Sequence, residues 1–210
     1  ERCKMSNEQT VFVVDDDDGV RDGLSLLLDT VGQPCELFES AYDFLEAYDT
    51  SRHGCLVLDI RMPRMTGLDL QEKLIDMGSK LPIIFITGHG DVPMAVEAMR
   101  RGAVDFIRKP FREHDLLERI NEALNLDDDI QKRQASRQKY SDHLASLSDR
   151  EWQVFERVAD GEMNKVIAAD LGISERTVEV HRGQVMRKLG VKTLAQLVRF
   201  KIESEVTATR

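Results

Sequence analysis

The chain has 210 residues, 41% hydrophobic and 32% charged, with a formal net charge of −9 at pH 7, and this length suits two domains better than one. Its longest apolar runs, such as residues 83–86, have four residues, far short of the roughly 20 that span a bilayer. No charged start followed by an apolar stretch marks a secretory signal. Three widely spaced cysteines, Cys3, Cys35 and Cys55, indicate reduced thiols without a metal. We therefore expect a cytoplasmic protein with no membrane partner.

The charge is distributed unevenly along the chain. Residues 1–126 carry 24 acidic and 14 basic side chains, a net of −10, whereas residues 127–210 carry 14 and 15, a net of +1. Within residues 163–192 there are six basic and three acidic side chains. This split indicates that the two halves bind different partners, a cation in the first and nucleic acid in the second. A mixed, solvated helix surface is the alternative.

Strands and helices alternate through the first half. Residues 11–14 form an apolar strand that runs into four aspartates, of which we interpret Asp17 and Asp18 as caps of the helix that follows and ends at Gly32. Further strands are predicted at residues 35–38, 55–58, 83–86 and 104–107, and further helices at about residues 42–48, 67–77, 92–101 and 116–124. Five alternating pairs of strand and helix, (βα)5, predict an α/β fold with a doubly wound parallel sheet.

Polar side chains follow four of these strands, at the point where each strand ends. Asp15 and Asp16 follow the first strand, Asp59 the third, Thr87 the fourth and Lys109 the fifth. Because the carboxyl ends of parallel strands share one edge of the sheet, we expect these side chains to converge. Two unit charges about 4 Å apart repel by about 4 kcal/mol at a protein surface, so clustered carboxylates indicate a bound cation. A solvated acidic turn is the alternative.

Four separate strings, VVDDDD, LDIRMPRMTG, FITG and DFIRKP, occur in the order found in the receiver domain of two-component response regulators. The chain resembles that domain over residues 9–126. The resemblance implies that Asp59 is the phosphoryl acceptor. It also implies that Asp16, Asp59 and the main-chain carbonyl of Arg61 bind Mg²⁺, which prefers oxygen ligands, and that Asp15 acts mostly through a bound water.

The same resemblance assigns roles to three further residues. Lys109 is expected to neutralise charge on the transferring phosphoryl group, and Thr87 to bond that group once it is attached. Phe106 stands where the family has a switch aromatic, and the Lys109–Pro110 peptide bond is typically cis. Taken alone, Thr87 could be a helix cap, Phe106 a core residue and Lys109 a surface residue.

Residues 127–145 predict a linker between two domains. They are polar, contain no glycine or proline and are rich in helix formers after Ile130. We expect a helical linker that continues the preceding helix. A break at the three aspartates 127–129, or a flexible tether, is the alternative.

Residues 146–208 predict a small all-α domain of four helices. Ser148 and Glu151 have the spacing of a capping box at the start of one helix. Gly172 supplies a turn, and Ser174 caps a longer helix rich in arginine and lysine. A short turn followed by a basic helix favours a helix-turn-helix that binds the major groove of DNA. An amphipathic helix pair in any small bundle is the alternative.

The sequence from LSDREWQVF to VMRKLGV is similar to LuxR-type DNA-binding domains. Together with the receiver, this identifies a response regulator of the NarL/FixJ subfamily, and the TVEVHR string resembles the FixJ, TodT and StyR group, several members of which govern aromatic-compound catabolism. The residues that the resemblance places against DNA are Lys165, Arg176, Thr177, Glu179, Val180, Arg182, Gly183 and Lys188.

Two of the residues in this domain depart from the family pattern. Glu179 replaces a common lysine, and because an acid can accept a hydrogen bond from cytosine but cannot bind phosphate, we expect an altered base preference. Met163 replaces the usual serine or threonine, which weakens the N-cap of its helix. In the last helix, an apolar stripe could pair subunits on DNA or pack in the core; its residues are Leu194, Leu197, Val198 and Ile202.

The sequence therefore predicts a transcriptional regulator rather than an enzyme. From the resemblance we expect a sensor histidine kinase to phosphorylate Asp59, the receiver to form a homodimer through its fourth helix and fifth strand, and the second domain to bind promoter DNA and engage RNA polymerase. A phosphorylation-independent DNA-binding protein is one alternative. An aspartyl-phosphate hydrolase is another, but such enzymes typically have a second acid at the position of Arg61.

Overall fold

The computed structural model describes residues 9–88 and 92–208, so Cys3 lies outside the described residues. The chain divides into two compact units, residues 1–131 and 132–210. Among the described residues, no helix is both long and apolar enough to cross a membrane.

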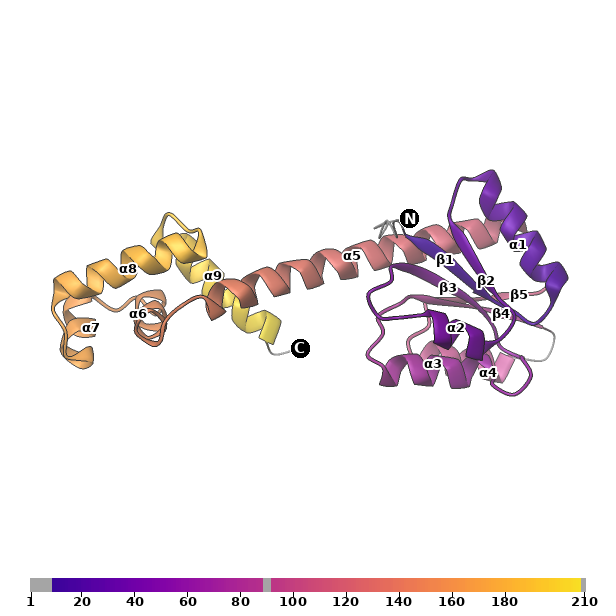
Figure 1. The fold of residues 1–210 in the computed structure, drawn as a ribbon, viewed down its shortest axis with the longest axis horizontal. Helices are drawn as coiled ribbons and strands as arrows, with labels where there is room; N and C mark the ends of the chain where they lie inside the picture. The colour runs from indigo at the N-terminus through magenta and orange to yellow at the C-terminus, as the bar shows by residue number, and fades with distance from the viewer. Residues whose placement is uncertain (1–8, 89–91, 209–210) are drawn as a thin grey trace, which may run out of the picture. The chain divides into compact units, whose positions relative to one another are not determined.

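The first unit contains a five-stranded parallel sheet with strand order β2-β1-β3-β4-β5, which confirms the predicted fold class (Figure 1). The strands are β1 (Thr10–Val14), β2 (Cys35–Phe38), β3 (Gly54–Asp59), β4 (Ile83–Thr87) and β5 (Asp105–Arg108). The helices that follow them are α1 (Asp18–Thr30), α2 (Ala41–Ala47), α3 (Gly67–Asp76), α4 (Val92–Arg100) and α5 (Glu113–Ala145).

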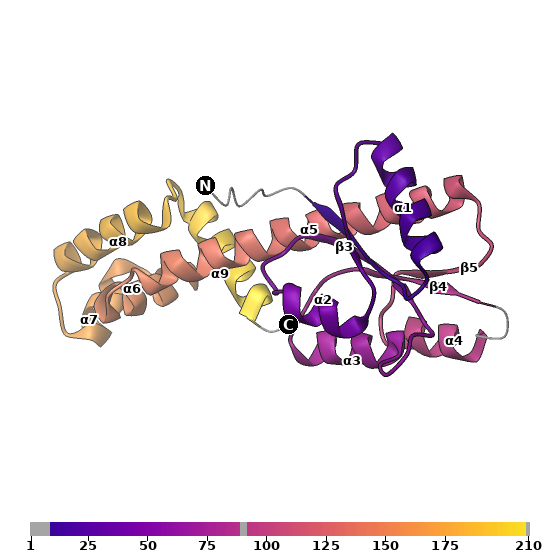
Figure 2. The same cartoon turned by 45° about the vertical axis from the view of Figure 1, so that its right-hand side comes forward.

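Helices cover both faces of the sheet, with α1 and α5 on one face and α2, α3 and α4 on the other (Figure 2). Strands β3 and β4 are buried at every position, as expected for strands enclosed on both sides. The α1 and α5 face includes Leu24, Leu28, Leu116 and Ile120. The opposite face is filled by larger side chains, which include Phe12, Phe44, Leu70 and Phe85.

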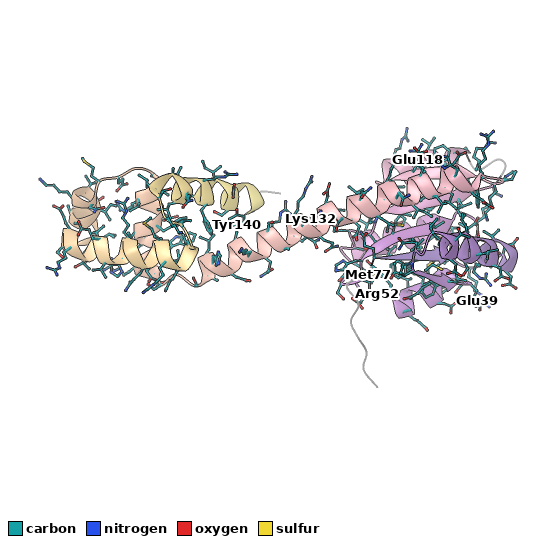
Figure 3. All side chains as sticks on the ribbon, turned by 90° about the horizontal axis from the view of Figure 1, so that it is seen from above. Glu39, Arg52, Met77, Glu118, Lys132 and Tyr140 are labelled. Atoms are coloured by element: carbon teal, nitrogen blue, oxygen red, sulfur yellow. The ribbon has the colours of Figure 1, made fainter. Side chains whose placement is uncertain are left out.

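Helix α5 is continuous through the predicted linker. The alternative of a break at the three aspartates does not occur, and Asp127 is buried. The side chains of residues 132–139 are all exposed, and Figure 3 shows Lys132 projecting from the helix. The linker is therefore helical, as predicted, but that stretch has no core of its own.

The second unit is helical, with four helices after the end of α5: α6 (Asp149–Ala159), α7 (Asn164–Leu171), α8 (Glu175–Leu189) and α9 (Leu194–Ala208). The predicted capping box of Ser148 and Glu151 is present at the start of α6. Ser174 caps α8 as predicted, and Met163 makes no side-chain cap at α7.

The apolar stripe of α9 divides between the core and the surface. Leu197 is fully buried in the core of the second unit, next to Phe200. Leu194 and Ile202 are 42% and 55% exposed. Core packing therefore accounts for one side of the helix and leaves an apolar edge on the other.

Candidate functional site

Four of the polar residues predicted to converge do so at the carboxyl edge of the sheet. Asp15 directly follows β1, Asp59 ends β3 and Thr87 ends β4. Lys109 directly follows β5. Because β1, β3, β4 and β5 are successive neighbours in the sheet, their ends bring these residues together. We call this group of Asp15, Asp59, Thr87 and Lys109 the acidic pocket.

Lys109 links the two carboxylates of the acidic pocket. Its Nζ donates to Asp15 Oδ2 and to Asp59 Oδ1, each at 2.7 Å. The side chains of Asp15 and Asp59 are only 1% and 8% exposed. The ammonium group of Lys109 therefore offsets part of the repulsion between the two buried carboxylates.

The charges of the acidic pocket perturb each other's titration. Burial raises the pKa of Asp59, the nearby Asp15 raises it further, and Lys109 acts in the opposite direction. For Lys109, partial burial works to lower the pKa, but the hydrogen bonds to Asp15 and Asp59 outweigh it and the pKa is raised. Lys109 thus stays charged, whereas Asp59 is a more basic carboxylate than an ordinary aspartate.

Main-chain groups fix the orientation of both carboxylates. Arg61 N–H donates to Asp59 Oδ2 at 2.6 Å, and Asp17 N–H donates to Asp15 Oδ1 at 3.0 Å. Gly67, the first residue of α3, lies so close to β3 that a Cβ there would stand 2.4 Å from the Asp59 carbonyl oxygen. A residue with no side chain is therefore required for α3 to begin beside the end of β3.

Thr87 and Phe106 lie where they were predicted, but neither touches the carboxylates. The buried Thr87 hydroxyl donates to the Ile107 carbonyl at 3.5 Å, and Thr87 O accepts from Lys109 N–H at 2.7 Å. Phe106 is partly buried against the core. The Lys109–Pro110 bond is cis, as the resemblance implied.

The donor chemistry of the acidic pocket fits Mg²⁺. Asp15 and Asp59 converge, whereas Asp16 is exposed. Across the described part of the chain, no three His, Cys, Asp or Glu residues are grouped so that they could hold a metal. Magnesium is commonly bound by one or two carboxylates with waters, so the carboxylates of Asp15, Asp16 and Asp59 and the Arg61 carbonyl are donors of the right kind.

Arg21 is a neighbour of the acidic pocket that sequence reasoning missed. Its Nη1 donates to the main-chain carbonyl of Asp15 at 2.6 Å, and its Nη2 pairs with Asp18. The i,i+3 spacing of Asp18 and Arg21 indicates an ion pair on a helix. No local pattern reveals the contact with the Asp15 carbonyl, which depends on how α1 packs beside the end of β1.

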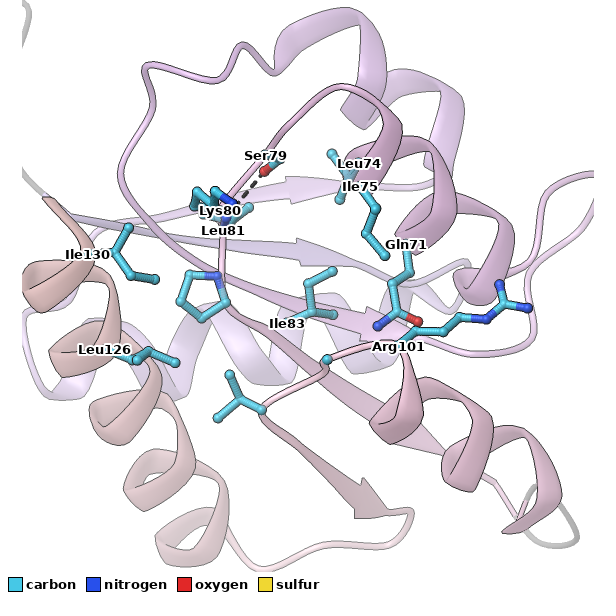
Figure 4. Close-up of a pocket in the computed structure, with 13 residues that line it drawn as sticks. Gln71, Leu74, Ile75, Ser79, Lys80, Leu81, Ile83, Arg101, Leu126 and Ile130 are labelled. Atoms are coloured by element: carbon cyan, nitrogen blue, oxygen red, sulfur yellow. Dashed lines mark hydrogen bonds between the residues drawn. The ribbon is translucent and has the colours of Figure 1, made fainter. Parts of the chain in front are cut away.

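A second pocket, of about 230 Å³, lies away from this site (Figure 4). It is lined by Gln71 of α3, by the Ser79 to Ile83 segment that leads into β4, and by Leu126 and Ile130 of α5. Since the Ser79 to Ile83 segment enters β4 at its amino end, the pocket is separate from the carboxyl edge.

In the second unit, α8 has one buried and one exposed face. Val178, Val185 and Leu189 are buried in the core. The exposed face combines basic, acidic, apolar and glycine residues: Arg176, Glu179, Val180, Gly183 and Arg187. Val180 is 54% exposed. This face can approach another molecule without disturbing the core.

Three of the other predicted contact residues differ in their surroundings. Lys165 is exposed on α7. Thr177 N–H bonds to the capping hydroxyl of Ser174 at 3.1 Å. Arg182 is half-buried and donates to Asn164 Oδ1 at 3.5 Å, which joins α8 to the start of α7.

Lys188 is hydrogen-bonded to other residues of the second unit. Its Nζ donates to Glu151 Oε2 at 2.6 Å and to Ser146 O at 2.8 Å. Hydrogen bonds from Lys188 and from Ser148 N–H lower the pKa of Glu151 to about 2. Lys188 therefore joins the end of α8 to the start of α6, so its expected role against DNA remains a prediction.

Comparison with known families agrees with both units. Residues 11–121 match the response regulator receiver domain, and residues 145–201 match the bacterial regulatory proteins of the luxR family. The chain therefore belongs to the response regulators that join a receiver to a LuxR-type DNA-binding domain, which are transcriptional regulators rather than enzymes. A receiver implies a sensor kinase as partner, and the second domain implies DNA; receiver domains generally bind Mg²⁺.

Individual relatives place the chain among NarL/FixJ-type regulators, as predicted. It is 47% identical to the transcriptional regulatory protein TdiR of Thauera aromatica over 197 residues, which cover 94% of this chain and 87% of TdiR. It is 42% identical to the transcriptional regulatory protein FixJ of Bradyrhizobium diazoefficiens over 200 residues, covering 95% and 98%. The solved structure of the response regulator StyR superposes with a TM-score of 0.89 at 46% identity, covering 93% of this chain and 99% of StyR.

Proposed function

We propose that a sensor histidine kinase activates this regulator by phosphorylating Asp59. The observation that carries the proposal is the contact of Lys109 with both Asp15 and Asp59 at the carboxyl edge of the sheet. A carboxylate oxygen of Asp59 forms the new bond to phosphorus as the bond between phosphorus and the kinase histidine nitrogen breaks. The raised pKa of Asp59 makes that oxygen a better nucleophile once it is deprotonated.

The remaining residues of the acidic pocket serve the transfer. Lys109 keeps its charge and neutralises the phosphoryl oxygens. Asp16, Asp59 and the Arg61 carbonyl would hold Mg²⁺, with Asp15 acting mostly through a bound water, and the ion would supply further charge neutralisation. The Thr87 hydroxyl leaves the Ile107 carbonyl, its weak partner at 3.5 Å, to bond the attached phosphoryl group.

A new dianion at this edge is a sufficient input for a switch. Moving a two-state equilibrium from 1:99 to 99:1 takes about 5.5 kcal/mol of differential stabilisation, and charge-assisted bonds from Thr87, Lys109 and Mg²⁺ can supply an amount of that order. Phe106 then changes its packing, and the receiver dimerises through α4 and β5.

The paired second domains bind promoter DNA through α8. Arg176 and Arg182, with Lys165 on α7, contact phosphates or their neighbours, while Glu179 and Val180 read base edges. The mixed exposed face of α8 supports this assignment. The bound dimer engages RNA polymerase in the cytoplasm, and genes for aromatic-compound breakdown are the proposed targets.

A promoter-binding titration tests the proposal. The full chain is incubated with Mg²⁺, with or without acetyl phosphate, and its affinity for duplexes selected from a random library is measured at two salt concentrations. We expect tighter binding after phosphorylation and a steep salt dependence. Equal affinity with and without acetyl phosphate would instead identify a phosphorylation-independent DNA-binding protein, and full labelling of Asp59→Asn would refute the acceptor assignment.

A further inference from the structure

The buried stripe of α5 ends in a carboxylate. Leu116, Ile120, Ala123 and Leu124 pack against the sheet, and Asp127 continues the same face with only 2% of its surface exposed. Burying a charged group costs free energy unless it is hydrogen-bonded. A hydrophobic residue would fill this position at lower cost, so the partners of Asp127 decide what it does.

Asp127 fixes α5 to two other segments of the first unit. Its Oδ2 accepts from Gly54 N–H at 3.0 Å and from Gln9 Nε2 at 3.1 Å, and its Oδ1 accepts from Gln131 Nε2 at 3.1 Å. Gln9 Nε2 also donates to Leu124 O at 2.7 Å. We call these contacts the Asp127 clamp.

Gly54 is suited to the Asp127 clamp because it has no side chain. Its φ is +137°, and a Cβ there would stand 1.8 Å from the carbonyl oxygen of Thr10, its partner across β1 and β3. Only glycine adopts this backbone freely. The start of β3 therefore presents a bare N–H to the carboxylate.

The Asp127 clamp holds the strands that carry the acidic pocket. Gln9 immediately precedes β1 and Gly54 begins β3. The opposite ends of these strands bear Asp15 and Asp59, one strand length away, which is about 15 to 20 Å for five or six residues. A change at the acidic pocket that shifts β1 or β3 therefore reaches α5 through the Asp127 clamp.

Apolar packing near the Asp127 clamp is incomplete, and α5 has no buried side chain from residue 132 to residue 139. Leu126 and Ile130 line the pocket of about 230 Å³ (Figure 4), and Leu126 is 43% exposed. Residues 132–139 are exposed on every side. Short helices without tertiary packing are marginal in water, and aspartate is a poor helix former. The polar bonds of Asp127 thus hold the turn of α5 that comes just before this exposed stretch.

We propose that Asp127 is the positioning residue through which phosphorylation at Asp59 acts on the linker helix. The proposal rests on the proposed function for its input and output. The Asp127 clamp keeps residues 128–139 helical, and removing it uncouples promoter binding from phosphorylation while the acidic pocket still accepts the phosphoryl group.

The test compares Asp127→Ala with Asp127→Asn in the full chain, with Asp129→Ala as the matched control. Asp129 is exposed, and its replacement by alanine removes the same negative charge as Asp127→Ala. Alanine is the better helix former, so local propensity predicts slower amide exchange in the linker at both positions. The Asp127 clamp instead predicts faster amide exchange in the linker for Asp127→Ala, but not for Asp129→Ala. Asparagine can still accept from Gly54 and Gln9 and should restore the wild-type behaviour.

Three measurements are made on each variant: labelling of Asp59 by acetyl phosphate with Mg²⁺, backbone amide exchange over residues 128–139, and DNA affinity with and without phosphorylation. For Asp127→Ala we expect unchanged labelling, about tenfold faster exchange, and an effect of phosphorylation on affinity that is reduced about fivefold. Asp127→Asn and Asp129→Ala should match the wild type in labelling and affinity.

Slow linker exchange in Asp127→Ala overturns the proposal. So does fast exchange throughout residues 9–126 with loss of labelling, because Asp127 then merely supports the fold. Gln9→Met, which removes one donor and leaves the carboxylate, provides a milder variant and should shift linker exchange in the same direction. If the wild type itself binds DNA equally with and without phosphorylation, the proposed function fails, while the exchange data still decide whether the Asp127 clamp orders the linker.

Discussion

Replacing Glu151 by glutamine should destabilise the DNA-binding domain while leaving its fold intact. Glu151 is 4% exposed and accepts from Lys188 Nζ at 2.6 Å and from Ser148 N–H at 2.7 Å. Glutamine keeps an acceptor oxygen for Ser148 but lacks the charge that bonds Lys188. The substitution therefore removes the ion pair and retains most of the capping box.

The expected loss is about 2 kcal/mol. A hydrogen bond to a charged group contributes about 1.5 to 3 kcal/mol, and the Lys188 side chain is 35% exposed, so water solvates part of the charge left behind. For a domain of this size, 2 kcal/mol lowers Tm by about 10 °C.

The single tryptophan allows the measurement in the full chain. Trp152 lies beside Glu151 in α6, with its ring centroid 5.7 Å from that of buried Phe155, and the chain has no other tryptophan. Its fluorescence therefore reports unfolding of this domain separately from the receiver. Glu156→Gln, an exposed substitution on the same helix, is the matched control and should change stability by less than about 0.5 kcal/mol.

The loss of stability caused by Glu151→Gln should become smaller as the pH falls. The pKa of Glu151 is lowered to about 2 from its usual 4.5, so its charge stabilises the folded domain above 4.5, and this contribution is lost as pH falls toward 2. The difference between wild type and Glu151→Gln should be constant from pH 7 to about pH 5 and narrow at lower pH. A difference below about 0.5 kcal/mol at pH 7, or one that grows on acidification, would refute this reasoning.

Three further predictions concern the two sites. Gly67→Ala places a Cβ 2.4 Å from Asp59 O and should cost about 1 to 3 kcal/mol and slow acetyl-phosphate labelling, whereas Gly23→Ala, which meets nothing within 4 Å on α1, should label normally. The labelling rate should fall as pH decreases, with a midpoint above 3.8, because the pKa of Asp59 is raised; a midpoint at or below 3.8 would contradict the burial argument. Selection of binding sites with Glu179→Lys should replace a preference for cytosine by one for guanine and steepen the salt dependence, and an unchanged preference would remove Glu179 from base reading.

Local sequence patterns were enough to predict the architecture and the acidic pocket. Apolar runs alternating with helical periodicity fix parallel βαβ units, and in such a sheet every strand presents its carboxyl end to the same edge. Asp15, Asp59, Thr87 and Lys109 could therefore be placed together without any knowledge of their contacts. The capping roles of Asp17, Ser148 and Ser174 were equally local, since each helix cap bonds within three residues along the chain.

Contacts between distant segments were decided only by the tertiary structure. The resemblance places Lys188 against DNA, and only the structure shows that Glu151, 37 residues away, accepts a hydrogen bond from it. The linker pattern left open a break at Asp127, but this residue is buried within a continuous helix and bonded to Gly54, 73 residues away. The sequence by itself determined which groups are charged and where the helices begin and end. Packing determined which of those charges face solvent, because burial depends on neighbours that no local pattern specifies.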